Sequence, residues 1–258
     1  MSGFEQNAAV HNELAADYDA HLSGNPHNAL ARKAFVELVA RHVHEASTLL
    51  DFGCGTGLDA LEYARRGYRV LAYDNSPGML AKLEHRCQSE IASGAISPCS
   101  VGYSSFLDCF PQAPAPQAVV SNFGVLNSIP DLASLFDTFA QRLAPPGWMI
   151  VSILNPIHWK ELKTFRLKTF RWWRSGHPHI YATEPYTTYL HFVPAVRRAA
   201  RAFQLVGRAN AGALVRYDAA AQRMWWGETT GRLRRVIWRT PAHRLLGHFV
   251  FLVFRRDP

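Results

Sequence analysis

The sequence contains few of the features that mark membrane-spanning, secreted or disulfide-stabilised proteins. No apolar run in its 258 residues reaches the roughly 18 residues that a membrane-spanning helix needs. The beginning, "MSGFEQNAAVHNELAADYDA", is mildly acidic and has no apolar stretch, so we expect no signal peptide. The four cysteines form no C-x-x-C pair and have no regular spacing. We therefore expect reduced thiols and a cytoplasmic location.

Negative charge is scarce in the second part of the chain. Residues 1–150 hold 9 Lys and Arg against 15 Asp and Glu, whereas residues 151–258 hold 19 against 5. This division indicates two surfaces that meet different ligands, because charge informs about partners rather than about fold. A solvated, arginine-rich face without a ligand is the alternative interpretation.

Apolar patterns that alternate between strands and helices run through the first 155 residues. Helical spacing covers 26–43, 57–67, 76–94 and 131–144, and short strand-like runs lie at 48–53, 68–74, 95–102, 117–124 and 148–156. The alternation predicts a doubly wound parallel sheet with helices on both faces. The pattern lapses after Asn155 and resumes near residue 201, which predicts an insertion at the ligand-binding edge of the sheet. We expect a single domain over 1–258, with cap helices in 1–45, a core in 46–155, a helical or irregular cap in 156–200 and closing strands in 201–258.

The stretch "LLDFGCGTGLDA" places three glycines between a strand and a helix. Such a loop aims backbone N–H groups at a ligand. A dinucleotide-binding G-x-G-x-x-G pattern would need glycine at position 58, where Leu58 stands. Asp51 precedes the glycines, and Asp74, at the end of the next strand, is well placed to accept hydrogen bonds from two ribose hydroxyls. The carboxylates favour a ligand with a cationic group over a pyrophosphate.

"LLDFGCGTG" and "VLAYDNSPGML" are similar to the first two cofactor motifs of class I S-adenosylmethionine-dependent methyltransferases of the bacterial small-molecule type. "AVVSNFGVLNSIPDLASLFDTFAQRLAPPGWMIVSIL" continues the resemblance, which covers about residues 10–155 well and the two closing strands loosely. It implies a Rossmann-like sheet of seven strands with the last one antiparallel. It also implies S-adenosylmethionine as methyl donor and S-adenosylhomocysteine as product. A dinucleotide-dependent oxidoreductase and a non-catalytic, cofactor-binding scaffold are the alternatives.

The resemblance assigns the cofactor contacts residue by residue. The glycines would lie beside the methionine part of the cofactor, with Asp51 near its amino group and Asp74 on the ribose. Tyr18, in "AADYDAHL", would cover the cofactor, and residues after the second and third strands would flank the adenine. The expected cofactor-binding residues are Tyr18, Asp51, Gly53, Cys54, Gly55, Gly57, Asp74, Asn75, Met79, Ser105, Phe106 and Asn122.

A hydroxyl or a protonated amine as acceptor would require a general base with a pKa near the working pH, which favours histidine. His158 follows the fifth strand and His191 stands in "YTTYLHFVPAVRRAARAF", so these two are the catalytic candidates. A structural or merely pocket-lining role is the alternative for each. We expect no metal site, because the histidines of "GHPHIY" have no acidic cluster nearby. The expected substrate contacts are Tyr18, Phe123, Trp159 and Tyr189.

The segment "HWKELKTFRLKTFRWWRSG" (158–176) has aromatic residues on about half of a helical wheel and basic residues on most of the rest. Three interpretations are open: a cap helix that lines the acceptor pocket, a helix on a membrane surface with a lipid-like acceptor, and a basic face for RNA. Nucleic acid is disfavoured, because no RNA-binding appendage is recognisable. We therefore expect an enzyme that methylates an oxygen or nitrogen of a small or amphipathic, even anionic, metabolite, in the cytoplasm or at the membrane surface.

Overall fold

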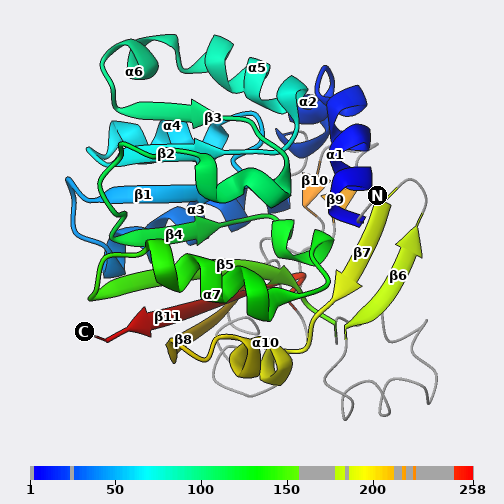
Figure 1. Ribbon diagram of the computed structural model, residues 1–258. Coiled ribbons are helices and arrows are strands. Elements are labelled where there is room, and N and C mark those ends of the chain that lie inside the picture. The colour runs from blue at the N-terminus through cyan, green and yellow to red at the C-terminus, as the bar shows by residue number, and fades with distance from the viewer. Residues whose placement is uncertain are drawn as a thin grey trace.

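A computed structural model describes residues 3–23, 26–156, 178–183, 186–211, 217–218, 223–224 and 247–257. Its centre is a seven-stranded sheet in the order β3-β2-β1-β4-β5-β11-β8 (Figure 1). β1 to β5 are parallel to one another, and β11 is antiparallel to both of its neighbours. The predicted doubly wound sheet with an antiparallel last strand is thereby confirmed.

The strands lie where the short apolar runs predict them. Their bounds are β1 (Thr48–Phe52), β2 (Arg69–Tyr73), β3 (Ile96–Cys99), β4 (Ala118–Ser121), β5 (Gly147–Leu154), β8 (Gln204–Ala211) and β11 (Phe249–Arg256). Pro98 is in β3, at the edge of the sheet, where the missing N–H of a proline interrupts no ladder between inner strands. Because β1, β2, β4 and β5 run in one direction, their carboxyl ends meet along a single edge.

The two faces of the sheet are covered by different helices (Figure 1). On one face α3 (Pro26–His42), α4 (Leu58–Arg65) and α5 (Pro77–Arg86) pack through residues such as Phe35, Tyr63 and Leu83. On the other face lie the 3-10 helix η1 (Tyr103–Asp108), α7 (Leu132–Arg142) and α10 (Val193–Ala199). The helix predicted over 76–94 is divided at Cys87 into α5 and α6 (Gln88–Ala92). Ser76 caps α5 as predicted, because its hydroxyl accepts a hydrogen bond from the Met79 N–H.

A cap built from two distant parts of the chain stands over the carboxyl ends of the strands. It combines α1 (Gly3–Leu14) and α2 (Tyr18–Ser23) with an antiparallel hairpin of β6 (His179–Thr183) and β7 (Tyr186–Leu190), and α1 packs on β7. The hairpin is an addition to the predicted helical or irregular cap. The segment 158–176 lies outside the described residues. A short pair of strands, β9 (Tyr217–Asp218) and β10 (Arg223–Met224), lies elsewhere in the second half of the chain.

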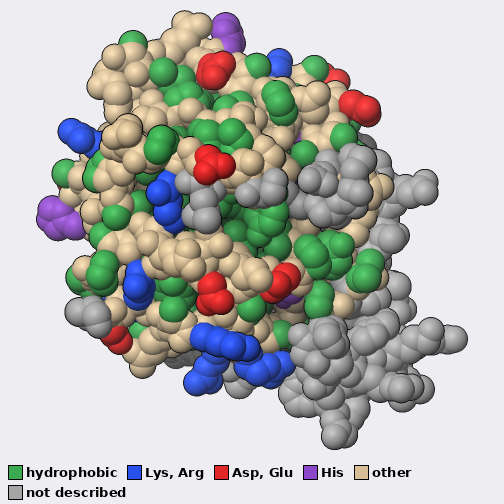
Figure 2. Space-filling view, viewed as in Figure 1, with side chains coloured by type: hydrophobic (Ala, Val, Ile, Leu, Met, Phe, Trp, Pro, Cys, Tyr) green, Lys and Arg blue, Asp and Glu red, His purple; other side chains and the backbone are tan. Residues whose placement is uncertain are grey.

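The surplus of positive charge in the second part of the chain is visible on the surface. Arg197, Arg198 and Arg201, in and just after α10, are exposed. Figure 2 shows basic side chains gathered at the place that α10 occupies in Figure 1. No helix of the described residues is long and apolar enough to cross a membrane.

The expectation of four reduced thiols is wrong for two of them. Cys99 ends β3 and Cys109 directly follows η1, and the two form a disulfide with their Cα atoms 6.1 Å apart. Cys54 and Cys87 are free and buried. The spacing of ten residues between the two cysteines did not indicate a disulfide. Their sulfurs meet only because the chain returns through η1 to the end of β3.

Candidate functional site

The loop between β1 and α4 is shaped by glycines in the left-handed backbone region, with φ of 79°, 54° and 81° at Gly53, Gly55 and Gly57. A Cβ at Gly53 would lie 2.5 Å from the γ-carbons of Val125, so that position has no room for a side chain. At Gly55 nothing lies within 4 Å of an added Cβ. The backbone at Gly55 is therefore open to a ligand.

Two cavities meet at this loop. The larger, of about 320 Å³, is walled by the loop, by the ends of β4 and β5, by the 3-10 helix η2 (Val125–Ser128), and by α1, α3 and β7. The smaller, of about 60 Å³, lies toward the end of β2. Tyr18, His11, Gly53 and Gly55 line both. Together the cavities form one elongated site along the carboxyl edge of the sheet, as expected for open α/β sheets.

Asp51 brings an unpaired acceptor to the wall of the larger cavity. The residue is only 3% exposed, and its Oδ2 atom has no hydrogen-bond partner among the described residues. Burial raises its pKa well above the usual range, and the charges of Asp59 and Asp74 act in the same direction. A buried carboxylate oxygen without a partner is costly, so this position is suited to a ligand that donates hydrogen bonds or carries positive charge.

Asp74 occupies the matching position at the end of β2, in the wall of the smaller cavity. Its Oδ2 accepts a hydrogen bond from the Gly55 N–H at 2.8 Å, and its Oδ1 accepts one from the Ser76 N–H at 2.9 Å. Burial raises its pKa to about 6, although these backbone donors favour the ionised form. Asn75 and Met79 line the same cavity. The carboxylate thus links the glycine loop to the part of the site where the predicted adenine neighbours lie.

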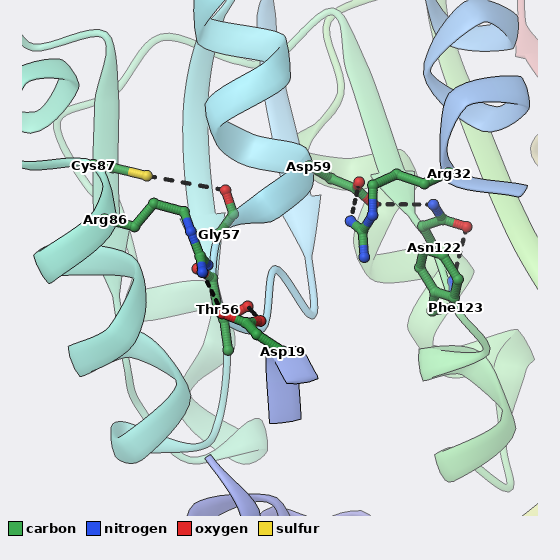
Figure 3. A network of polar contacts seen from close by, with 9 residues as sticks. All are labelled: Asp19, Arg32, Thr56, Gly57, Asp59, Arg86, Cys87, Asn122 and Phe123. Atoms are coloured by element: carbon green, nitrogen blue, oxygen red, sulfur yellow. Dashed lines mark hydrogen bonds and ion pairs between the residues drawn. The ribbon is translucent and has the colours of Figure 1, made fainter. Parts of the chain in front are cut away.

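A polar network crosses the opposite wall of the larger cavity (Figure 3). Arg32, from α3, forms an ion pair with Asp59 in the first turn of α4, and its guanidinium lies 4.6 Å from the centre of the Phe123 ring. Asn122 Nδ2 donates to Asp59 Oδ2 at 3.0 Å, and Asn122 Oδ1 accepts from the Phe123 N–H at 2.8 Å. These contacts hold Asn122 and Phe123, which directly follow β4, in place at the wall of the cavity.

The cap is fastened over the site by Asn7 of α1. Its Nδ2 donates to the Thr187 carbonyl at 2.8 Å, its Oδ1 accepts from the Thr187 N–H at 2.8 Å, and Nδ2 also lies 3.0 Å from Ser128 Oγ. One turn further along α1, the His11 ring lies 5.9 Å from the Tyr18 ring and 5.2 Å from the Tyr186 ring, measured between ring centres. Burial lowers the pKa of His11, against a hydrogen bond to the backbone of Asn7 that raises it. Burial also raises the pKa of Tyr18 to about 12, so its hydroxyl stays protonated.

Most of the cofactor residues predicted from the sequence lie together in these walls. Gly57 differs, because it stands at the start of α4, where an added Cβ would lie 2.6 Å from Leu83 Cγ, and it lines neither cavity. Phe123, predicted as a substrate contact, lines the larger cavity. The predicted cofactor residues that line one cavity or both are Tyr18, Asp51, Gly53, Cys54, Gly55, Asp74, Asn75, Met79 and Asn122. Their contacts with a cofactor stay a prediction.

The prediction of Phe106 as an adenine contact conflicts with its place in the structure. Its ring packs at 5.1 Å from that of Phe52 and at 4.8 Å from that of Tyr73, inside the main hydrophobic core. Ser105, its neighbour in η1, lines neither cavity. Phe106 also lies 6.2 Å from the Phe139 ring of α7, so it fills the space between η1, α7 and the sheet.

His191 is not placed for catalysis. It is 4% exposed, its Nε2–H donates to the Ile129 carbonyl at 2.9 Å, and it lines neither cavity. Burial lowers its pKa to about 4, so the ring is neutral and serves to join the end of β7 to the segment after η2. The other candidate, His158, lies outside the described residues.

Tyr189 is also turned away from the larger cavity, to which its strand contributes Tyr186 and Thr188 instead. Alternate residues of a strand point to opposite faces, so Tyr189 lies on the face opposite to that of Tyr186 and Thr188. The Tyr189 carbonyl accepts a hydrogen bond from Asn127 Nδ2 at 2.7 Å, which anchors β7 to η2. Trp159, the remaining predicted substrate contact, lies outside the described residues.

Several residues of the site were not found by sequence reasoning. Arg32, Asp59 and His11 stand on helices at positions that an exposed, charged helix face would equally explain, so nothing singled them out. Asp59 carried a weak signal, since it follows the glycine loop by two residues in the first turn of α4. Within the described residues, no group of His, Cys, Asp and Glu could hold a metal ion.

Comparison with known proteins identifies the family to which the chain belongs. Residues 21–192 match a family model described as a methyltransferase domain. A curated relative, the ubiquinone biosynthesis O-methyltransferase of Xylella fastidiosa, is 30% identical over 142 residues, 54% of this chain and 54% of that protein. The chain therefore spans about half the length of the curated relatives it matches.

Two solved structures share the fold. The 1,6-didemethyltoxoflavin-N1-methyltransferase of Burkholderia thailandensis, with bound S-adenosylhomocysteine, has a TM-score of 0.59 and 15% identity, over 100% of this chain and 92% of that one. The N-methyltransferase NodS of Bradyrhizobium japonicum, in complex with S-adenosylhomocysteine, has a TM-score of 0.54 and 16% identity, over 92% and 91%. At this identity the likeness concerns the fold alone.

Proposed function

The chain belongs to the methyltransferase domain family and has the fold of class I S-adenosylmethionine-dependent methyltransferases, and from this premise we propose that it methylates an oxygen or nitrogen of a small or amphipathic metabolite. The observation that carries the proposal is the elongated site at the glycine loop, with Asp51 and Asp74 in its two cavities. The name of the curated relative, an O-methyltransferase, favours a hydroxyl acceptor.

The walls of the site fit S-adenosylmethionine in chemistry. The unpaired Asp51 oxygen suits the amino group of the methionine part, and the open space at Gly55 leaves room for the ligand beside the backbone. Asp74 suits the ribose hydroxyls, with Asn75 and Met79 beside the adenine and Tyr18 over the cofactor. When bound, this cofactor supplies a methyl group already activated by its sulfonium.

Arg32 is the cation that suits the cofactor's carboxylate. Among the described residues that line the larger cavity, Arg32 is the one with a positively charged side chain of the Arg or Lys type. It is already paired with Asp59. The described walls therefore hold no further arginine or lysine for the acceptor.

His11 takes the role of general base that the sequence assigned to other histidines. Among the described residues it is the histidine that lines the cavities, and its ring stands between Tyr18 and Tyr186 at the cap. The hydrogen bond to the Asn7 backbone engages one ring nitrogen, which leaves the other to accept a proton from an acceptor hydroxyl. Because its pKa is lowered, the ring is neutral at pH 7 and able to act as a base.

Positioning provides the rest of the catalysis in this account. An acceptor held in line with the donor's S–CH3 bond reacts without a covalent enzyme intermediate. The Asn7 clamp holds α1 and β7 together, so His11, Tyr186 and Thr188 present a fixed surface to the acceptor. A cap closed in this way also limits water at the site.

The test is release of S-adenosylhomocysteine from S-adenosylmethionine in the presence of phenols, catechols and amines, including lipid-tailed phenols with and without phospholipid vesicles. The proposal expects turnover with at least one hydroxyl or amine compound, and a product heavier by one methyl group in the mass spectrum. Binding of S-adenosylhomocysteine without turnover across the panel would favour a non-catalytic scaffold. Turnover only with vesicles present would favour the lipid-like acceptor at a membrane surface.

A further inference from the structure

Three residues from separate segments form a closed ring of contacts behind the glycine loop (Figure 3). Thr56, inside the loop, donates from its hydroxyl to Asp19 Oδ1 of α2 at 2.6 Å. Arg86, in the last turn of α5, pairs through Nη2 with Asp19 Oδ2 and donates through Nη1 to the Thr56 carbonyl. Each residue contacts the other two, so none can shift without breaking a contact to both.

The ring connects α2 of the cap to the glycine loop, with Arg86 of α5 contacting both. Asp19 directly follows Tyr18, which lines both cavities, and Thr56 lies between two loop glycines. Asp19 and Arg86 have only 30% and 24% of their side chains exposed. Hydrogen bonds between ionised partners are stronger than neutral ones, and partial burial lessens the screening of this pair.

The cap has two further anchors, both in α1. Asn7 holds α1 to β7, and Asn12 Oδ1 accepts a hydrogen bond from the Gly78 N–H at 2.6 Å at the start of α5. Neither of these anchors touches the glycine loop. Among the described contacts, the ring of Asp19, Thr56 and Arg86 is the one that ties the position of α2 to the conformation of the loop.

We propose that Arg86 and Asp19 are positioning residues that hold Tyr18 closed over the cofactor and couple its position to the glycine loop. The inference rests on the proposed function, because it needs the cofactor at this loop. It explains why a tyrosine and an aspartate stand next to each other at the start of α2. The tyrosine faces the site, and the aspartate fixes the tyrosine in place.

The test is calorimetric titration of S-adenosylhomocysteine into the wild type, Arg86→Ala, Tyr18→Ala and the double variant. We expect Arg86→Ala to bind about tenfold more weakly, which is about 1.4 kcal/mol. Because Arg86 acts through Tyr18, the double variant should bind no more weakly than Tyr18→Ala alone. A merely structural role would instead make the two losses add.

Arg66→Ala is the matched control. Arg66 also bridges two segments, pairing with Glu37 and Glu62 at 2.9 Å with 29% of its side chain exposed, and it lines neither cavity. We expect its affinity for S-adenosylhomocysteine to equal that of the wild type. Asp19→Asn, which keeps the size of the side chain, repeats the test if Arg86→Ala does not fold, and Arg86→Lys should recover part of the affinity.

The outcomes separate the two claims. Wild-type affinity in Arg86→Ala and Asp19→Asn, or additive losses in the double variant, would overturn the positioning role while leaving the cofactor site intact. An equal loss in Arg66→Ala would overturn it as well, since the effect would then be general. A wild type that does not bind S-adenosylhomocysteine would overturn the proposed function itself.

Discussion

Replacing Gly55 with alanine adds a single carbon atom, and its effects on folding and on cofactor binding can be measured separately. The residue has φ of 54°, and an added Cβ meets nothing within 4 Å. Without a clash, the cost to folding is the strain of a left-handed alanine, about 1–2 kcal/mol. For a chain of this size we expect a fall in Tm of about 2–4 °C for each kcal/mol, measured by differential scanning fluorimetry.

The effect on binding has a different origin. Gly55 lines both cavities, so we expect the new methyl group to occupy volume that the cofactor needs. Crowding one extra methyl group into a packed site costs roughly 1–3 kcal/mol. Because each 1.4 kcal/mol is about tenfold in Kd, calorimetry with S-adenosylhomocysteine should show a loss of roughly fivefold to more than a hundredfold.

Gly67→Ala provides the control, because Gly67 has φ of 88°, equally open space and a position after α4 that lines neither cavity. We expect a similar fall in Tm and an unchanged affinity. Wild-type affinity in Gly55→Ala, measured on folded protein, would refute the placement of the cofactor at this loop. Equal losses of affinity in both variants would show that strain, and not occupied volume, is responsible.

Other predictions concern titration and the disulfide. Burial raises the pKa of Asp74 to about 6, so its carboxylate becomes protonated as the pH falls through 6. Affinity for S-adenosylhomocysteine should therefore decrease between pH 7 and pH 5, and a constant Kd over that range would contradict the ribose contact. Because burial lowers the pKa of His11 below 6.5, methylation of a hydroxyl should persist at pH 6.5 and fall only at lower pH. His11→Gln should lower kcat and remove that acidic limb at saturating cofactor, and an unchanged kcat would exclude the base. The bond between Cys99 and Cys109 closes a loop of ten residues, and its loss should cost about 2–3 kcal/mol. A reducing agent should thus lower the Tm of the wild type but not that of a variant with serine at both positions, and an insensitive wild type would count against the bond.

The sequence predicted best those features that depend on the ends of parallel strands. Asp51, Asp74 and Asn122 each stand at or near the carboxyl end of a buried strand, and a parallel sheet brings such ends to one edge whatever the helices do. The glycines were equally predictable, because left-handed backbone at a strand-to-helix turn favours that residue.

The rest of the site depends on how the cap and the helices pack, which no local pattern encodes. Arg32 and His11 look like ordinary polar positions of a helix until α3 and α1 are placed against the sheet. His191 was a plausible base by type and position, yet it is buried against the Ile129 carbonyl and lines neither cavity. Phe106 shows the same limit, because an aromatic residue after the third strand serves a core as well as an adenine.

The most direct test of the central claim is calorimetric titration of S-adenosylhomocysteine into the wild type and Asp74→Ala, with a thermal melt to verify that the variant is folded. The account predicts binding by the wild type and a loss of about 2–3 kcal/mol in the variant, the scale of hydrogen bonds to a charged group. No binding by the wild type, with heat instead on addition of a nicotinamide dinucleotide, would contradict it.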